Sequence, residues 1–234
     1  MLLTSKVDRP WQVSLRQVVN AILKVLKTGC QGRQLPCEFP AWSAIYYYCY
    51  CWSCDWAWEG LNHTLCSRLQ QWVGRHQHQT ATCLDRQSVT KAQRCRDLGA
   101  TTPASRSTGR KRHLRGDTLE LLLAVAVTAA SRQDRDGARL LLGHLPGGCK
   151  KLRKFWMDGG YAGRVVDWVA ERFRFCLSVL LRPKESRNFV LLPRRWGVER
   201  TLSWLYPSRH LNERYERLTR TDEAWVYIAM TRIM

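Results

Sequence analysis

The sequence lacks any long apolar run. No uninterrupted stretch of 18 or more apolar residues occurs. The start of the chain, Met1–Lys6, ends in a lysine that no long apolar segment follows. A membrane-spanning helix needs about 20 apolar residues, and a secretory signal needs an apolar segment of about 7–15. The sequence therefore predicts neither, and we expect a cytoplasmic protein without a membrane partner.

Acidic residues are also scarce. The chain has 19 Asp and Glu against 38 Lys and Arg, which gives a net charge of +19 over 234 residues. Such an excess is typical of proteins that bind a polyanion, and nucleic acid is the leading candidate. The basic residues are spread along the whole chain instead of lying on one amphipathic face, which argues against a membrane surface.

The ten cysteines show no clear metal-binding spacing. Cys49, Cys51 and Cys54 follow one another closely, with Cys37 upstream, but no second ligand pair stands at zinc-finger distance. Cysteines of a reducing compartment are mostly free thiols. Zinc is therefore the less favoured interpretation.

The first third of the chain has helical periodicity. Apolar residues recur at helical spacing over Ser14–Thr28, with Ser14 as the N-cap and Gly29 as the stop. An aromatic run over Trp42–Trp58 and leucines at every fourth position from Leu61 predict further helices. We expect a small helical region over residues 1–78, which either contacts DNA or packs as a helical cap with a core of aromatic residues.

The rest of the chain alternates between strand and helix patterns. Residues 81–84 predict a strand that ends at Asp85, and the apolar run Leu119–Ala130 predicts a central strand. A helix begins at Asp134, and two more strands and a final helix follow. Their ranges are Lys154–Met157, Phe175–Leu181 and 194–205. This order predicts an α/β sheet flanked by helices, in a domain over residues 79–234.

Three acids stand out in this second region. Asp85 and Asp158 each follow a predicted strand, and Glu199 lies on the predicted helix among basic residues. Carboxylates gathered from strand ends and a facing helix are the ligands that Mg²⁺ prefers. Asp117 and Asp136 are rival acids, which we interpret as a strand-end turn and a helix cap.

A basic cluster precedes the apolar strand. Its members are Arg110, Lys111, Arg112 and His113. They are candidates for contacts with DNA phosphates, and the alternative is a solvated edge of a hairpin.

Seven ordered motifs make the chain similar to a known family. In chain order they are Leu84–Val89, Gly109–His113, Asp117–Leu119, Thr128–Ala138, Asp158–Gly163, Leu192–Thr201 and Tyr215–Leu218. Together with Asn20–Leu23 and Thr28–Gln31, they resemble bacterial insertion-sequence transposases of the DDE type, in the "insertion sequence five" family. The resemblance covers nearly the whole chain.

The resemblance implies a fold, a reaction and a cofactor. The fold would be RNase H-like, a mixed sheet flanked by helices, behind a small N-terminal helical domain. Asp85, Asp158 and Glu199 would be catalytic and would hold two Mg²⁺ ions, or Mn²⁺ as a substitute, for cleavage and strand transfer of insertion-sequence ends.

The resemblance also implies partners and DNA contacts. The partners would be double-stranded DNA, as terminal inverted repeats and as target DNA, and a second copy in a homodimer on that DNA within the bacterial nucleoid. Beside the basic cluster, the residues expected to contact DNA are Arg194, Arg195, Arg200 and Arg209.

Some positions depart from the family pattern. Arg86 follows the first acid where the family usually has serine, Leu192 replaces a tyrosine, and Ala100–Ala104 replaces a Gly-Tyr-Asp-Ala-Gly segment. Two alternatives to an active transposase stay open. One is a protein that only binds DNA, as a catalytically inactive remnant or a domesticated regulator. The other is an unrelated Mg²⁺-dependent nuclease on the same fold, which would hydrolyse DNA without joining strands.

Overall fold

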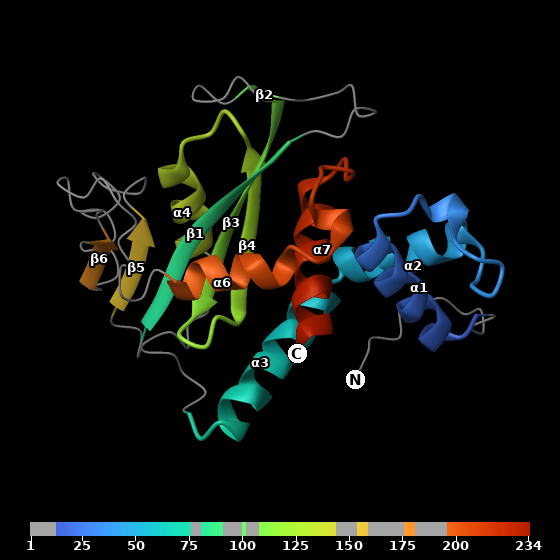
Figure 1. Ribbon diagram of the computed structural model, residues 1–234, viewed down its shortest axis with the longest axis horizontal. Helices are drawn as coiled ribbons and strands as arrows, with labels where there is room; N and C mark the ends of the chain where they lie inside the picture. The colour runs from blue at the N-terminus through green and yellow to red at the C-terminus, as the bar shows by residue number, and fades with distance from the viewer. Residues whose placement is uncertain are drawn as a thin grey trace.

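The computed structural model is built on one mixed β-sheet with helices on both of its faces (Figure 1). It describes residues 13–75, 81–90, 100–101, 108–143, 154–158, 176–180 and 196–234. The first two helices, at residues 15–28 and 42–54, lie at the end of the molecule opposite β5 and β6, and the third, at residues 57–72, runs below the sheet. No helix among these residues is long and apolar enough to span a membrane.

The sheet combines antiparallel and parallel pairing. Its strands are β1 (Ala81–Thr90), β2 (Ala100–Thr101), β3 (Thr108–Asp117), β4 (Leu122–Ala129), β5 (Lys154–Asp158) and β6 (Cys176–Leu180). The order is β4-β3-β1-β5-β6, and the short β2 pairs with the beginning of β3. β1, β3 and β4 are antiparallel neighbours, whereas β5 and β6 run parallel to β1.

The prediction that β1 ends at Asp85 was wrong. β1 continues to Thr90 because β3 pairs with it as far as Thr90 and Gly109. What ends near Asp85 is the parallel pairing with β5, whose last pair is Leu84 with Met157. Asp85 therefore lies where β1 loses its parallel neighbour.

The sequence predicted a central strand over Leu119–Ala130, and this prediction was wrong, because β4 lies at an edge of the described sheet. Among the described residues it pairs only with β3. Its apolar character comes from helices on its faces, since α3, α4 and α7 all contact it. Burial of both faces by helices removes the need for polar alternation even on an outer strand.

The helices of the N-terminal third form as predicted. They are α1 (Leu15–Thr28), α2 (Trp42–Cys54) and α3 (Ala57–Trp72). Ser14 occupies the N-cap position of α1, and Gly29 ends the helix in the left-handed conformation, with φ of 65°. Glycine suits that position because it has no Cβ to clash with the preceding turn.

One continuous apolar core joins these helices to the sheet. The C-terminal helix α7 (Thr219–Ile233) lies at its centre and contacts α1, α2, α3 and β4. Ile22 and Leu26 of α1, Leu114 of β3 and Ile228 of α7 are all buried in it. The predicted boundary between residues 78 and 79 thus falls between segments that share a core, and the division into two domains stays a prediction.

Candidate functional site

The first two predicted acids occupy neighbouring positions in the sheet. Leu84 of β1 pairs with Met157 of β5, and Asp85 and Asp158 are the next residue on each of these parallel strands. Residues in register on parallel neighbours lie on the same face, about 4.8 Å from strand to strand. Two acids that are far apart in the sequence therefore share one face at the end of a parallel pair.

The third acid lies on the helix that covers this face. Asp85 is opposite Leu114 of β3. Leu114 is buried in one core with Leu205 of α6 (Trp196–Leu205) and with residues of α7. α6 contacts β1, and Glu199 is in its first turn (Figure 1). The half-buried carboxylate of Asp85 accepts a hydrogen bond from the Arg86 backbone at 2.7 Å. The side chains of Asp158 and Glu199 lie outside the described part, so a meeting of the three carboxylates stays a prediction.

Arg86, one of the departures from the family pattern, points away from this face. Its guanidinium pairs with Asp134 of α4 (Asp134–Gly143) at 2.9 Å. In register it is opposite His113, whose ring lies against Gly137 of the same helix. Because side chains alternate along a strand, Arg86 faces α4 while Asp85 faces α6. Its positive charge is neutralised on the opposite side of the sheet.

α6 is anchored to the β3–β4 turn by Glu120. Arg200 places Nε 3.2 Å from Glu120 Oε2 and Nη1 3.3 Å from Oε1. The hydroxyl of Thr201 donates to the Glu120 carbonyl at 2.8 Å. These contacts attach the helix one and two residues after Glu199, so Glu120 helps to set where that acid lies. Arg200, predicted to contact DNA, is used in this ion pair, although half of its side chain (52%) stays exposed.

The sequence offered little signal for Glu120. It adopts a left-handed backbone conformation, with φ of 68°, which is uncommon for residues other than glycine. Asp117 stabilises this turn by accepting hydrogen bonds from the backbones of Leu119 and Leu121, and Gln70 of α3 donates to its other oxygen at 2.8 Å. Burial raises the pKa of Asp117. Its interpretation as a strand-end turn is confirmed.

The predicted basic cluster is buried inside the protein. Arg110, Lys111 and Arg112 lie in β3, at the middle of the sheet between α4 and α7. Arg112 donates to Asp222 of α7 at 2.7 Å, and Arg110 donates to the same carboxylate at 3.3 Å. Lys111 pairs with Asp134 on the other face at 3.0 Å. The prediction that these residues contact phosphates was wrong, because helices from distant parts of the chain cover them and supply the counter-charges.

His113 is buried with this cluster. One ring nitrogen is 2.9 Å from the hydroxyl of Thr128, and the residue is fully buried. Burial lowers the pKa of His113 to about 4, so the ring is neutral at pH 7. It therefore carries no charge for a DNA phosphate.

The remaining predicted DNA contacts divide into two groups. Arg209 begins the short helix η4 (Arg209–Leu211) and is exposed. Arg194 and Arg195 lie outside the described residues. Of the predicted basic positions that the structure describes, Arg209 and half of Arg200 face solvent.

Comparison with the sequence models of known protein families gives two matches. Residues 76–234 match the sequence model of the family described as "Transposase DDE domain". Residues 1–62 match a second family, described as "Putative transposase of IS4/5 family". A search of curated proteins found no match.

Proposed function

Because the chain belongs to the DDE transposases of the IS4/IS5 group, we propose that it cleaves the ends of an insertion sequence and joins them to target DNA. The observation that carries this proposal is the position of Asp85 and Asp158 on adjacent parallel strands, beneath the helix that bears Glu199. The strand order β4-β3-β1-β5-β6, antiparallel on one side of β1 and parallel on the other, supports an RNase H-like fold.

The three acids fit a divalent metal site. Asp85, Asp158 and Glu199 provide only carboxylate oxygens, which suit Mg²⁺ and its substitute Mn²⁺. Two bound ions would supply Lewis-acid chemistry, by activating the attacking oxygen and stabilising the leaving oxygen of a phosphodiester. Among the residues whose side chains the structure describes, no three His, Cys, Asp or Glu residues form a metal-binding group. The proposed site therefore depends on Asp158 and Glu199.

Other residues of the chain would position this chemistry. Glu120 holds α6 through Arg200 and Thr201, which restricts the movement of Glu199 relative to β1. Arg195 stands one helical turn before Glu199 in sequence, where it would contact the phosphate next to the bond that breaks. Asp134 keeps the charge of Arg86 on the opposite face of the sheet.

The proposed partners follow from the family and the charge. We expect double-stranded DNA as terminal inverted repeats and target, with two copies of the chain holding two ends, in the bacterial nucleoid. The net charge of +19 supports DNA binding, and it supports equally a remnant that binds DNA without cutting it. Only an assay of cleavage separates these two functions.

The test compares nicking by matched variants. Purified protein is incubated with DNA that carries the flanking element ends and Mg²⁺, and nicked product is quantified. We expect Asp85→Asn and Glu199→Gln each to lose at least about 100-fold of the rate, since changes in the shell around a metal site already cost about 10–100-fold. DNA affinity should change little.

Asp136→Asn is the matched control. Asp136 is a half-exposed carboxylate (48%) on α4, so its variant should nick like the unmodified protein. Equal nicking by Glu199→Gln and the unmodified protein would remove Glu199 from the mechanism. End binding without nicking by the unmodified protein would favour the inactive remnant.

A further inference from the structure

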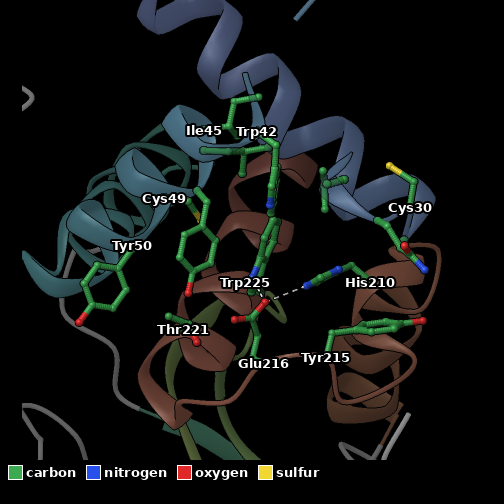
Figure 2. A pocket seen from close by; sticks show the side chains of 16 residues that line it. Cys30, Trp42, Ile45, Cys49, Tyr50, His210, Tyr215, Glu216, Thr221 and Trp225 are labelled. Carbon is green, nitrogen blue, oxygen red and sulfur yellow. Dashed lines mark hydrogen bonds and ion pairs between the residues drawn. The ribbon is translucent and has the colours of Figure 1, made fainter. Parts of the chain in front are cut away.

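A second site lies among the N-terminal helices, at the end of the molecule opposite β5 and β6 (Figures 1 and 2). It is a cavity of about 190 Å³ between α1, α2, η4 and α7. A buried cavity of about 150 Å³ is large enough to bind benzene. This cavity therefore has room for one planar ring.

Aromatic side chains form the walls of the cavity. Trp42, Tyr46 and Tyr50 follow one another at every fourth position of α2, with ring centroids 5.9 Å and 6.4 Å apart. On the side of the cavity opposite α2, Tyr215 stacks on His210, with ring centroids 5.1 Å apart (Figure 2). Tyr46 is 50% exposed and Tyr215 is 43% exposed, so the mouth of the cavity presents aromatic rings to solvent.

A carboxylate lies inside this aromatic cavity. Glu216 Oε1 accepts hydrogen bonds from the Trp225 indole at 2.8 Å and from His210 at 3.2 Å (Figure 2). Burial alone would raise the pKa of Glu216, but hydrogen bonds from His210, Thr221 and Trp225 outweigh it and hold that pKa below its usual value. An ionised carboxylate has about four acceptor positions, so Glu216 can also accept from a ligand.

Two exposed arginines are next in sequence to residues that line the cavity. Exposed Arg33 follows Gly32, and exposed Arg209 precedes His210, where Gly32 and His210 both line the cavity. A ligand that combines a planar ring, an N–H donor and a flanking negative charge would match all three features. A nucleotide whose base has left the DNA stack has this combination.

We propose that this cavity binds one unpaired nucleobase of the DNA that the protein holds. The base would lie against Tyr46 and Tyr50, its amino group would donate to Glu216, and the adjacent phosphates would meet Arg33 and Arg209. The inference rests on the proposed function only in taking DNA as the partner. Cytosine carries an exocyclic amino group and thymine does not, so the site should prefer cytosine to thymine.

The test measures binding without catalysis. Fluorescence anisotropy in EDTA compares three labelled duplexes: one fully paired, one with a single bulged cytosine and one with a single bulged thymine. We expect the cytosine bulge to bind about tenfold more tightly than the paired duplex, because stacking of a base on aromatic side chains strengthens binding. The thymine bulge should bind between the two.

Two tyrosines on α2 supply a matched pair of variants. Tyr46→Ala removes a wall of the cavity and should abolish most of the preference for bulged DNA. Tyr47→Ala removes an equally exposed ring (54%) that does not line the cavity, and should keep that preference. Glu216→Gln should reduce the preference for cytosine over thymine. Since Glu216 is also hydrogen-bonded within the fold, the Tyr46 and Tyr47 pair decides the result if that variant is unstable.

Several outcomes overturn the proposal. Equal affinity for bulged and paired DNA would do so, and so would equal losses in Tyr46→Ala and Tyr47→Ala. If Tyr46→Ala instead weakened self-association without DNA, the cavity would belong to a side chain of a second copy. If the unmodified protein prefers bulged DNA but does not nick DNA, the result supports the cavity site. It then contradicts only the proposed cleavage function.

Discussion

At the scale of single residues, Asp222 determines the role of the basic cluster. Its carboxylate is 2% exposed and accepts hydrogen bonds from Arg110 and Arg112, both buried in β3. Arg112 also donates to the carbonyl of Leu211. Burial of the two guanidinium groups is tolerated only while the Asp222 carboxylate supplies the opposite charge.

Asp222→Asn should therefore strongly destabilise the protein. The variant leaves two buried arginines without their carboxylate, and we expect the free energy of unfolding to fall by about 3–5 kcal/mol. Urea denaturation at neutral pH measures this change. Asp136→Asn, which alters a half-exposed pair with Arg139 at 3.9 Å, should change stability by less than about 1 kcal/mol. Similar values for the two variants would contradict this account.

At the scale of elements, the position of α6 depends on one turn. The turn between β3 and β4 presents Glu120, which binds Arg200 and accepts from Thr201. Asp117 stabilises the turn, and Gln70 connects it to α3. The helix that carries Glu199 is thus held by contacts far from it in the sequence.

Glu120→Ala should loosen α6 without unfolding the sheet. The lost ion pair is partly exposed at Arg200, so we expect a local cost of about 1 kcal/mol, or roughly fivefold faster amide hydrogen exchange in α6. Exchange in α4 should not change. Arg139→Ala is the control, because it removes an exposed pair on α4. Unchanged exchange in α6 would show that Glu120 does not hold the helix.

At the scale of the whole molecule, the N-terminal helices and the sheet are held together by α7. Val226, Ala229 and Met230 of α7 are fully buried in the core that α1, α2 and β4 also form. Removal of the helices would expose this apolar surface to water. A shared core of this kind predicts one cooperative folding unit.

A fragment of residues 76–234 should therefore fail to unfold cooperatively. We expect circular dichroism to show a broad, shallow thermal transition for the fragment and a single sharp one for the chain of 234 residues. Co-expression with residues 1–75 should restore the sharp transition. If the fragment alone melts as sharply as the chain, the predicted boundary at residue 78 is a real domain boundary.

Sequence periodicity was enough for the local elements. The apolar spacing that predicted α1, the end of that helix at Gly29 and the strands β5 and β6 depends on residues within a few positions of one another. The order of Asp85, Asp158 and Glu199 along the chain was likewise sufficient to propose the site. The local elements follow from short-range physics, since caps and periodic burial act within one or two turns.

Only the tertiary structure decided which charges are available. Arg110 and Arg112 are basic residues of the kind that contacts DNA phosphates, but their partner Asp222 lies more than 100 residues later in the chain. The proximity of Asp85 and Asp158 likewise depends on the parallel register of β1 and β5. A charged side chain contacts DNA only if the fold leaves it in solvent, and that depends on which distant segments cover it.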